Sequence, residues 1–250
     1  MHLELNEPGR GRFSPGRRPP QRSSRGAGAA LSSSGAETPL TTYSLNPGIV
    51  RLSTLGCSLA AHFCADLKGA QNLPPPPYVL LPKHQSMLDI ILEGMLVYRT
   101  QRIFPHYLMK HTLPDWLGFY GGIPVVRQRD STSSGERRRN IDALRRAKEV
   151  LAEKGVLVLH PEGTRFRGAV GELQEAGLAM IVGWQKDLGR IPLVPVGIRY
   201  DRQIHVRVGV PRLYTSVGKP ELQELRNDLA QLSRMNFYDP PAQGTETTAR

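Results

Sequence analysis

The segment KHQSMLD places His84 five residues before Asp89, directly after the apolar run YVLLP. An imidazole whose one ring nitrogen is held by a carboxylate has its other nitrogen available as a general base near neutral pH. On one continuous helix, five residues would turn the two side chains well away from each other. They meet only if His84 precedes a helix and Asp89 lies in the first turn of that helix.

The spacing of Ser86 and Asp89 favours this arrangement. SMLD fits the capping box, which would make Ser86 the N-cap and Asp89 the third helical residue. Two other interpretations remain open from these residues alone. Asp89 acts only as a cap and His84 is an incidental loop residue, or Ser86 is a nucleophile beside His84.

A second polar segment, HPEGTRF, follows the apolar run VLVL. Gly163 permits a positive φ or a close backbone approach. The planar guanidinium of Arg165 suits a phosphate group, and Glu162 can accept hydrogen bonds or orient a neighbour. Taken alone, this turn is better explained as an exposed loop.

Apolar runs with alternating strand and helix patterns surround both polar segments. Strands are predicted over 78–82, 121–127, 156–159, 191–198 and 204–211, and helices over 86–99, 137–155, 173–189 and 221–235. The order predicts an α/β fold with a mostly parallel sheet flanked by helices. Ligands bind outside the carboxyl ends of such strands, where both polar segments lie. In the helix 137–155, the residues expected to face the core are Ile141, Leu144, Ala147 and Leu151.

Composition divides the chain into three parts. These are a disordered basic tail (1–45), a folded domain (46–236) that opens with an amphipathic helix (46–68), and a disordered C-terminal tail (237–250). The stretch 49–67 contains Arg51 and Asp66, which makes it too polar for a membrane-spanning helix. We expect it to lie at a membrane interface or to dock on the domain.

The charge of the chain indicates anionic partners. A net charge of +11 and a pI near 10.0 favour nucleic acid, an anionic membrane surface or phosphorylated substrates. The basic residues are not interleaved with aromatic stacking platforms, which weakens a nucleic-acid-binding module as the alternative. Cys57 and Cys64 form no CxxC pair, so neither a zinc knuckle nor a disulfide framework is indicated. The N-terminal residues lack the apolar core of a secretory signal.

The ordered set HQSMLD, GGIPVVR, HPEGTR and VPV resembles the four-motif pattern of the glycerolipid acyltransferases, also called lysophospholipid acyltransferases. The resemblance covers roughly residues 72–210. It implies an O-acyltransferase that moves a fatty acyl group from acyl-CoA or acyl-carrier protein to a lysophospholipid. The first acceptor it implies is 1-acylglycerol 3-phosphate, which would give phosphatidic acid. Glycerol 3-phosphate, an aminolipid or another membrane alcohol are the alternative acceptors.

The resemblance also implies roles for individual residues. His84 would be the general base, with Asp89 orienting its ring. The residues expected to bind or shape the acceptor site are Lys110, Arg127, Glu162, Gly163, Thr164 and Arg165, of which the three cations would contact a phosphate. The resemblance implies no metal and no cofactor. It also implies association with the cytoplasmic face of a membrane, peripheral or monotopic, and no nucleic-acid partner.

Two positions depart from the family pattern. His160 stands where an aromatic residue is common, and Phe166 stands where serine is common. Both flank the expected acceptor pocket and leave the acceptor open. His160 is either a second titrating group or a structural histidine. His106 and His111 are expected in a proline-bounded loop, and with His84 they match no zinc-ligand spacing.

Overall fold

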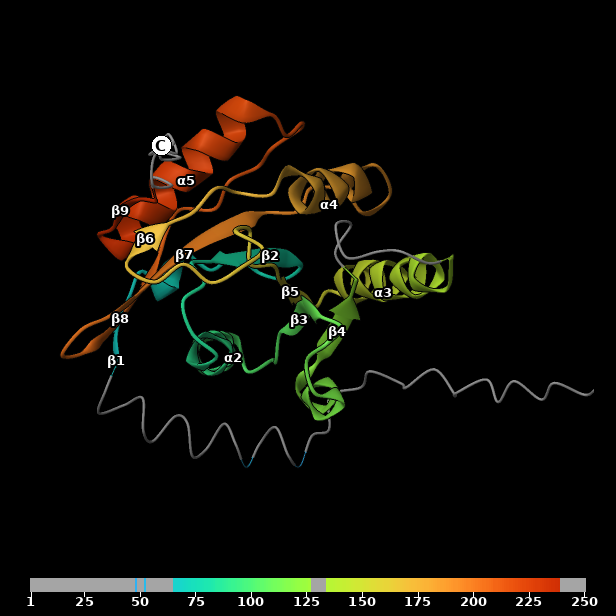
Figure 1. The fold of residues 1–250 in the computed structure, drawn as a ribbon, viewed down its shortest axis with the longest axis horizontal. Coiled ribbons are helices and arrows are strands. Elements are labelled where there is room, and N and C mark those ends of the chain that lie inside the picture. The colour runs from blue at the N-terminus through green and yellow to red at the C-terminus, as the bar shows by residue number, and fades with distance from the viewer. Residues whose placement is uncertain (1–47, 49–51, 53–64, 127–133, 239–250) are drawn as a thin grey trace, which may run out of the picture. The chain divides into compact units, whose positions relative to one another are not determined.

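The computed structural model describes Gly48, Leu52 and residues 65–126 and 134–238 (Figure 1). In chain order the elements, with short 3₁₀ helices labelled η, are β1 (Ala65–Lys68), η1 (Ala70–Asn72), β2 (Tyr78–Pro82), α2 (Leu88–Gln101), β3 (His106–Lys110), η2 (Asp115–Tyr120), β4 (Gly122–Val125), α3 (Ser134–Ala152), β5 (Val156–Val158), β6 (Ala169–Val170), α4 (Glu175–Leu188), β7 (Leu193–Tyr200), β8 (Ile204–Val208), α5 (Lys219–Ser233) and β9 (Asn236–Phe237).

A seven-stranded sheet in the order β1-β8-β7-β2-β5-β3-β4 organises these elements. The strands β7, β2, β5, β3 and β4 run parallel to one another. β8 is antiparallel to β7, and β1 is parallel to β8. The predicted α/β fold with a mostly parallel sheet is confirmed. The carboxyl ends of β2, β3, β4 and β5 therefore meet at one edge, where we expected the polar segments.

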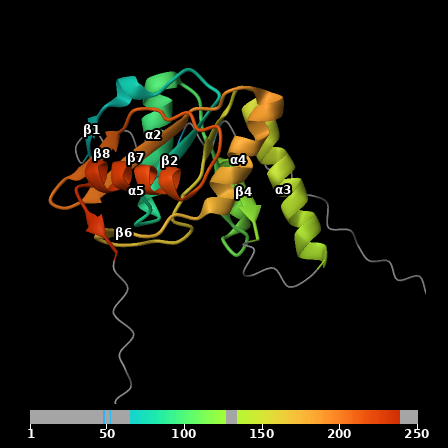
Figure 2. The same ribbon diagram turned by 90° about the horizontal axis from the view of Figure 1, so that it is seen from above.

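Helices cover both faces of the sheet (Figure 1). α2 packs on one face through residues such as Leu96. α3, α4 and α5 cover the other face through residues such as Val150, Ile181 and Leu225, and Figure 2 shows α5, α4 and α3 in that order across it. Because β2 lies between two helical layers, all five of its residues are buried, as its continuous apolar run predicts.

The inward face of α3 differs in part from the prediction. Ala147 and Leu151 are buried as expected, but Ile141 is 66% exposed. Ala143 and Val150 fill the face that turns toward the sheet. The apolar pattern alone did not identify this face, because the arginine-rich first turns give it no clear polar boundary.

Two strands replace other predicted structure. Residues 65–68, predicted as the end of the helix 46–68, form the edge strand β1 and pair with β8. Asp66 accepts a hydrogen bond from Arg207 across this pair, at 3.1 Å. His106, predicted in a loop, begins β3, which pairs with β4 and β5. Both strands depend on partners far along the chain, which local patterns do not reveal.

The predictions for the two tails fall largely on residues that are not described. Residues 1–45, most of 46–64 and residues 239–250 lie outside the described part of the chain. β9 reaches Phe237, one residue beyond the predicted end of the domain. No helix within the described residues is long and apolar enough to span a membrane.

Candidate active site

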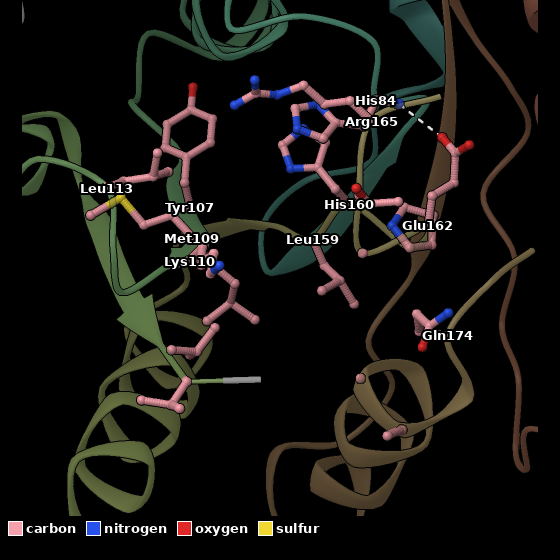
Figure 3. A pocket seen from close by; sticks show the side chains of 18 of the residues that line it. His84, Tyr107, Met109, Lys110, Leu113, Leu159, His160, Glu162, Arg165 and Gln174 are labelled. Carbon is pink, nitrogen blue, oxygen red and sulfur yellow. Dashed lines mark hydrogen bonds between the residues drawn. The ribbon is translucent and has the colours of Figure 1, made fainter. Parts of the chain in front are cut away.

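A cavity of about 1130 Å³ opens at the edge of the sheet where β2, β3 and β5 end. The polar side chains in its wall include His84, Lys110, His160, Glu162, Thr164 and Arg165. Figure 3 shows His84, His160 and Arg165 on one side of the cavity, with Tyr107, Met109 and Lys110 on the other. The sheet thus brings together segments that are far apart in the sequence.

His84 and Asp89 form the pair that their spacing predicts. Nδ1 of His84 lies 2.9 Å from Oδ2 of Asp89, and the Asp89 side chain is fully buried. Because Nδ1 faces the carboxylate, Nε2 on the other side of the ring is the nitrogen that can act on a substrate. Burial lowers the pKa of His84 to about 4, so the ring is neutral near pH 7 and can accept a proton.

Asp89 is held by donors from three directions. Oδ2 also accepts the backbone N–H groups of Gln85 at 2.6 Å and Ser86 at 2.7 Å. Oδ1 accepts the hydroxyl of Tyr200, on β7, at 2.5 Å. Burial would raise the pKa of Asp89, but the hydrogen bonds from His84, Ser86, Tyr200 and Gln85 lower it. The carboxylate is therefore ionised and its orientation is fixed.

The start of α2 differs by one residue from the predicted capping box. Met87, not Ser86, is the N-cap of α2, and it makes no side-chain capping bond. Half of the box is present, since Asp89 accepts the Ser86 backbone N–H. Oγ of Ser86 accepts the N–H of Leu88 at 3.2 Å. The role of Ser86 is consistent with local capping, and Asp89 lies in the first helical turn as predicted.

Glu162 is more deeply buried than we expect for a residue that contacts the acceptor. It is 2% exposed, and protein donors occupy both of its oxygens. Oε1 accepts the backbone N–H of His84 at 3.0 Å, and Oε2 accepts that of Gly171 at 2.8 Å. Lys83 Nζ lies 3.0 Å from Oε1 and 3.1 Å from Oε2. These contacts make Glu162 a residue that positions the backbone of His84.

Lys83 is a functional-site residue that the sequence reasoning missed. It is completely buried, and beyond Glu162 it donates to the carbonyl oxygens of His84 at 3.0 Å and Phe166 at 2.6 Å. Burial lowers the pKa of Lys83, whereas Glu162 raises it. A lysine beside a histidine in a polar segment reads as a surface residue, so no local signal identified this role.

The Gly-Thr-Arg turn is placed as the sequence predicts. Gly163 has a φ of 64°, the left-handed conformation that glycine adopts easily. Thr164 and Arg165 are exposed at the cavity wall. Nη2 of Arg165 lies 2.8 Å from Sδ of Met87. Arg165 therefore stands at the mouth of the cavity, beside the start of α2.

The other two predicted phosphate ligands have different outcomes. Lys110 is the last residue of β3 and lines the cavity. Arg127 lies outside the described residues, so its predicted contact with a phosphate stays a prediction.

Apolar side chains, in part from α3 and α4, form the section of the cavity wall that is here called the apolar limb. The side chains that line it include Leu108, Val125, Leu144, Leu159 and Met180. Such a lining suits an aliphatic chain, since each buried methylene contributes about 0.8 kcal/mol. The cavity thus combines a base, cations and an apolar limb.

Comparison with known proteins agrees with this combination. The sequence matches the family model named Acyltransferase over residues 64–199, more than half of the chain. A 1-acyl-sn-glycerol-3-phosphate acyltransferase of Chlamydomonas reinhardtii is 30% identical over 140 residues, which cover 50% of this chain and 39% of that protein. The enzyme of the same name from Saccharomyces cerevisiae is 31% identical over 132 residues, which cover 51% and 40%. The matches thus span about two fifths of the length of these curated relatives.

A solved structure has the same fold. The crystal structure of the 1-acyl-sn-glycerophosphate (LPA) acyltransferase PlsC from Thermotoga maritima superposes with a TM-score of 0.51 and 19% identity. The superposition covers 74% of this chain and 77% of that chain. The family match includes the segments of His84 and Arg165, which confirms the resemblance seen in the four motifs. The chain therefore belongs to the Acyltransferase family.

Proposed function

We propose that this protein transfers a fatty acyl group from an acyl thioester to the hydroxyl of a lysophospholipid, with 1-acylglycerol 3-phosphate as the first acceptor to test. The observation that carries the proposal is the His84–Asp89 pair at the wall of a cavity that also holds cations and an apolar limb. The donor is acyl-CoA or acyl-carrier protein, which share the reacting thioester.

The reaction needs one base and no covalent intermediate on the protein. Nε2 of His84 takes the proton of the acceptor hydroxyl, and the hydroxyl oxygen attacks the carbonyl carbon of the thioester. The tetrahedral intermediate collapses, the carbon–sulfur bond breaks, and the thiolate takes the proton from His84. The products are an ester and a free thiol. Asp89 supports the imidazolium that forms in between, as the carboxylate does in a Ser-His-Asp triad.

Different parts of the cavity wall suit the phosphate of the acceptor and the acyl chain of the donor. Lys110 and Arg165 carry positive charge in the cavity wall and suit the acceptor's phosphate, which needs several charge-assisted bonds to leave water. Arg127, predicted as a further phosphate ligand, follows β4 directly after Val126, which lines the cavity. The apolar limb suits the acyl chain.

A membrane surface is the proposed source of the acceptor. Met87, Leu88 and Ile91, at the start of α2, are 39%, 51% and 42% exposed. Met87 also lines the cavity and contacts Arg165, and Leu88 and Ile91 lie close to it on the first turns of α2. We expect Leu88→Glu/Ile91→Glu to weaken binding to anionic liposomes by roughly tenfold or more. Ile141→Glu changes an exposed isoleucine on α3 and is the matched control.

The test of the function is thiol release from an acyl thioester in the presence of lysolipid. Purified protein is assayed with acyl-CoA and with acyl-carrier protein against lysophosphatidic acid, glycerol 3-phosphate and other lysolipids. Release should depend on the acceptor and fall roughly 10²–10⁴-fold in His84→Ala. If no combination of donor and acceptor gives thiol release, the proposal is overturned. Thiol release that survives His84→Ala would overturn the mechanism.

A further inference from the structure

The cavity contains a second imidazole–carboxylate pair next to the first. Nε2 of His160 lies 3.0 Å from Oε1 of Glu93. Glu93 follows Asp89 by four residues in α2, so the two carboxylates lie one helical turn apart. The Glu93 side chain is fully buried and that of His160 is 12% exposed. The acyl-transfer steps described above assign no role to this second pair.

The two imidazole rings are in contact. The ring centroids of His84 and His160 lie 3.9 Å apart, with an angle of 33° between the planes, and Figure 3 shows the rings side by side. The carbonyl of His160 accepts the N–H of Gly163 at 3.0 Å, while Glu162 holds the backbone of His84. The same turn therefore holds the backbone of both histidines. Because the rings are in contact, a proton on one ring opposes a proton on the other.

Several elements place charged groups around this contact. α2 contributes Asp89 and Glu93, and the turn after β5 contributes Glu162 and Arg165. Lys83, before His84, neutralises Glu162. The remaining titratable neighbours are the hydroxyls of Tyr200, on β7, which bonds Asp89, and Tyr107, on β3, which lies near Glu93. Each carboxylate other than Glu93 has several donors.

His160 is the neighbour that favours the charged form of Glu93. The second oxygen of Glu93, Oε2, is buried and has no hydrogen-bond partner among the described residues. Burial raises the pKa of Glu93. Burial alone would lower the pKa of His160, but Glu93 raises it. The two groups therefore act as one unit, because each favours the charged form of the other.

We propose that His160, held by Glu93, is a positioning residue that opposes protonation of the adjacent ring of His84 and so lowers the pH at which His84 stops acting as a base. This inference rests on the proposed function of His84 as the base. A proton on His160 opposes a proton on His84 across the 3.9 Å contact.

The acid limb of the pH–rate profile tests this role. His160→Phe keeps an aromatic ring against His84 but removes the charge, and Glu93→Gln removes the partner that keeps His160 charged. In both variants the apparent pKa of the acid limb of kcat/KM should rise by about one unit or more. His205→Gln is the matched control, since His205 lies on β8 and contacts Asp66 of the edge strand β1, and it should leave the limb in place.

The direction of the Glu93→Gln shift separates the proposal from its rivals. If Glu93 acted on His84 as an independent anion, its removal would lower the pKa of His84 and move the limb down. If the pair were only structural, both variants would lose activity or stability with the limb unmoved. Either result overturns the proposal, and an upward shift in both variants supports it.

A titration of the ligand-free protein separates failure of the inference from failure of the proposed function. The ring protons of His84 are followed by NMR against pH in the wild type, His160→Phe and Glu93→Gln. An upward shift of the His84 midpoint supports the pair even if no acyl transfer is found. An unchanged midpoint in folded variants overturns the inference even if the enzyme is active.

Discussion

The buried ion pair between Lys83 and Glu162 allows a quantitative prediction. Lys83→Met removes the ammonium that contacts both oxygens of Glu162 and the carbonyl oxygens of His84 and Phe166. Both side chains of the pair are fully buried, so the substitution leaves a carboxylate without its counter-charge in the core. Breaking such a pair by removing one partner costs about 3–5 kcal/mol. For a domain of this size, that lowers Tm by roughly 6–20 °C.

A double substitution separates stability from catalysis. Lys83→Met/Glu162→Leu removes both charges, and replacement of a buried pair by apolar residues is often neutral. We therefore expect the double variant to regain at least about half of the lost stability. It should remain poorly active, because no carboxylate is left to hold the backbone N–H of His84. Urea unfolding and acyl transfer are measured on the wild type and all three variants, including Glu162→Leu.

An exposed pair provides the control for this experiment. Lys148 contacts Asp187 on the surface, with side chains 35% and 64% exposed, so Lys148→Met should cost less than about 1 kcal/mol. If Lys83→Met were equally mild, the buried pair would not tie the two catalytic segments together. Equal damage in Lys83→Met and the double variant would also refute the reasoning, because the cost would then not come from the unpaired charge.

Three further predictions concern other parts of the described chain. Tyr200→Phe removes one hydrogen-bond donor to Asp89. A hydrogen bond to a charged group is worth about 1.5–3 kcal/mol, so kcat/KM should fall roughly 10- to 100-fold. An unchanged kcat/KM would count against a role of Tyr200 in orienting Asp89. Gly197→Ala should fail to give soluble protein, because its Cβ would lie 2.4 Å from the backbone of α5, whereas Gly183→Ala, with open space around it, should raise Tm. Because the pKa of His84 is about 4 in the fold and 6.5 when unfolded, its stabilisation is present above pH 6.5 and lost toward pH 4. Urea unfolding at several pH values should show a shallower loss in His84→Ala.

The sequence was most informative where function depends on the ends of parallel strands. The apolar runs before His84 and before His160 predicted two strands, and both form. Parallel strands that lie side by side must bring their carboxyl ends together, and β2 does pair with β5. The meeting of the two polar segments could therefore be predicted without knowing any side-chain contact.

Strands with distant partners could not be predicted in the same way. The run HYLMK of β3 lies between Pro105 and Pro114, so it was expected to be a loop. It becomes a strand because β4 and β5 supply its hydrogen bonds on both sides. The same reason explains β1, whose residues complete an apolar helical pattern but pair with β8.

The polar groups of the site show the limit of local reasoning most clearly. Asp89 was found because His84 is its neighbour in sequence. Glu93 occupies the next turn of the same helix, yet its partner His160 lies 67 residues away, and Lys83 and Glu162 are separated by 79 residues. Burial of each of these groups is tolerable only with its partner in place. The pairs can therefore be assembled only once the sheet has brought their segments together. It follows that the proposed base, His84, becomes oriented and supported only in the complete fold, and substitutions at these distant partners should change catalysis as much as substitutions beside His84.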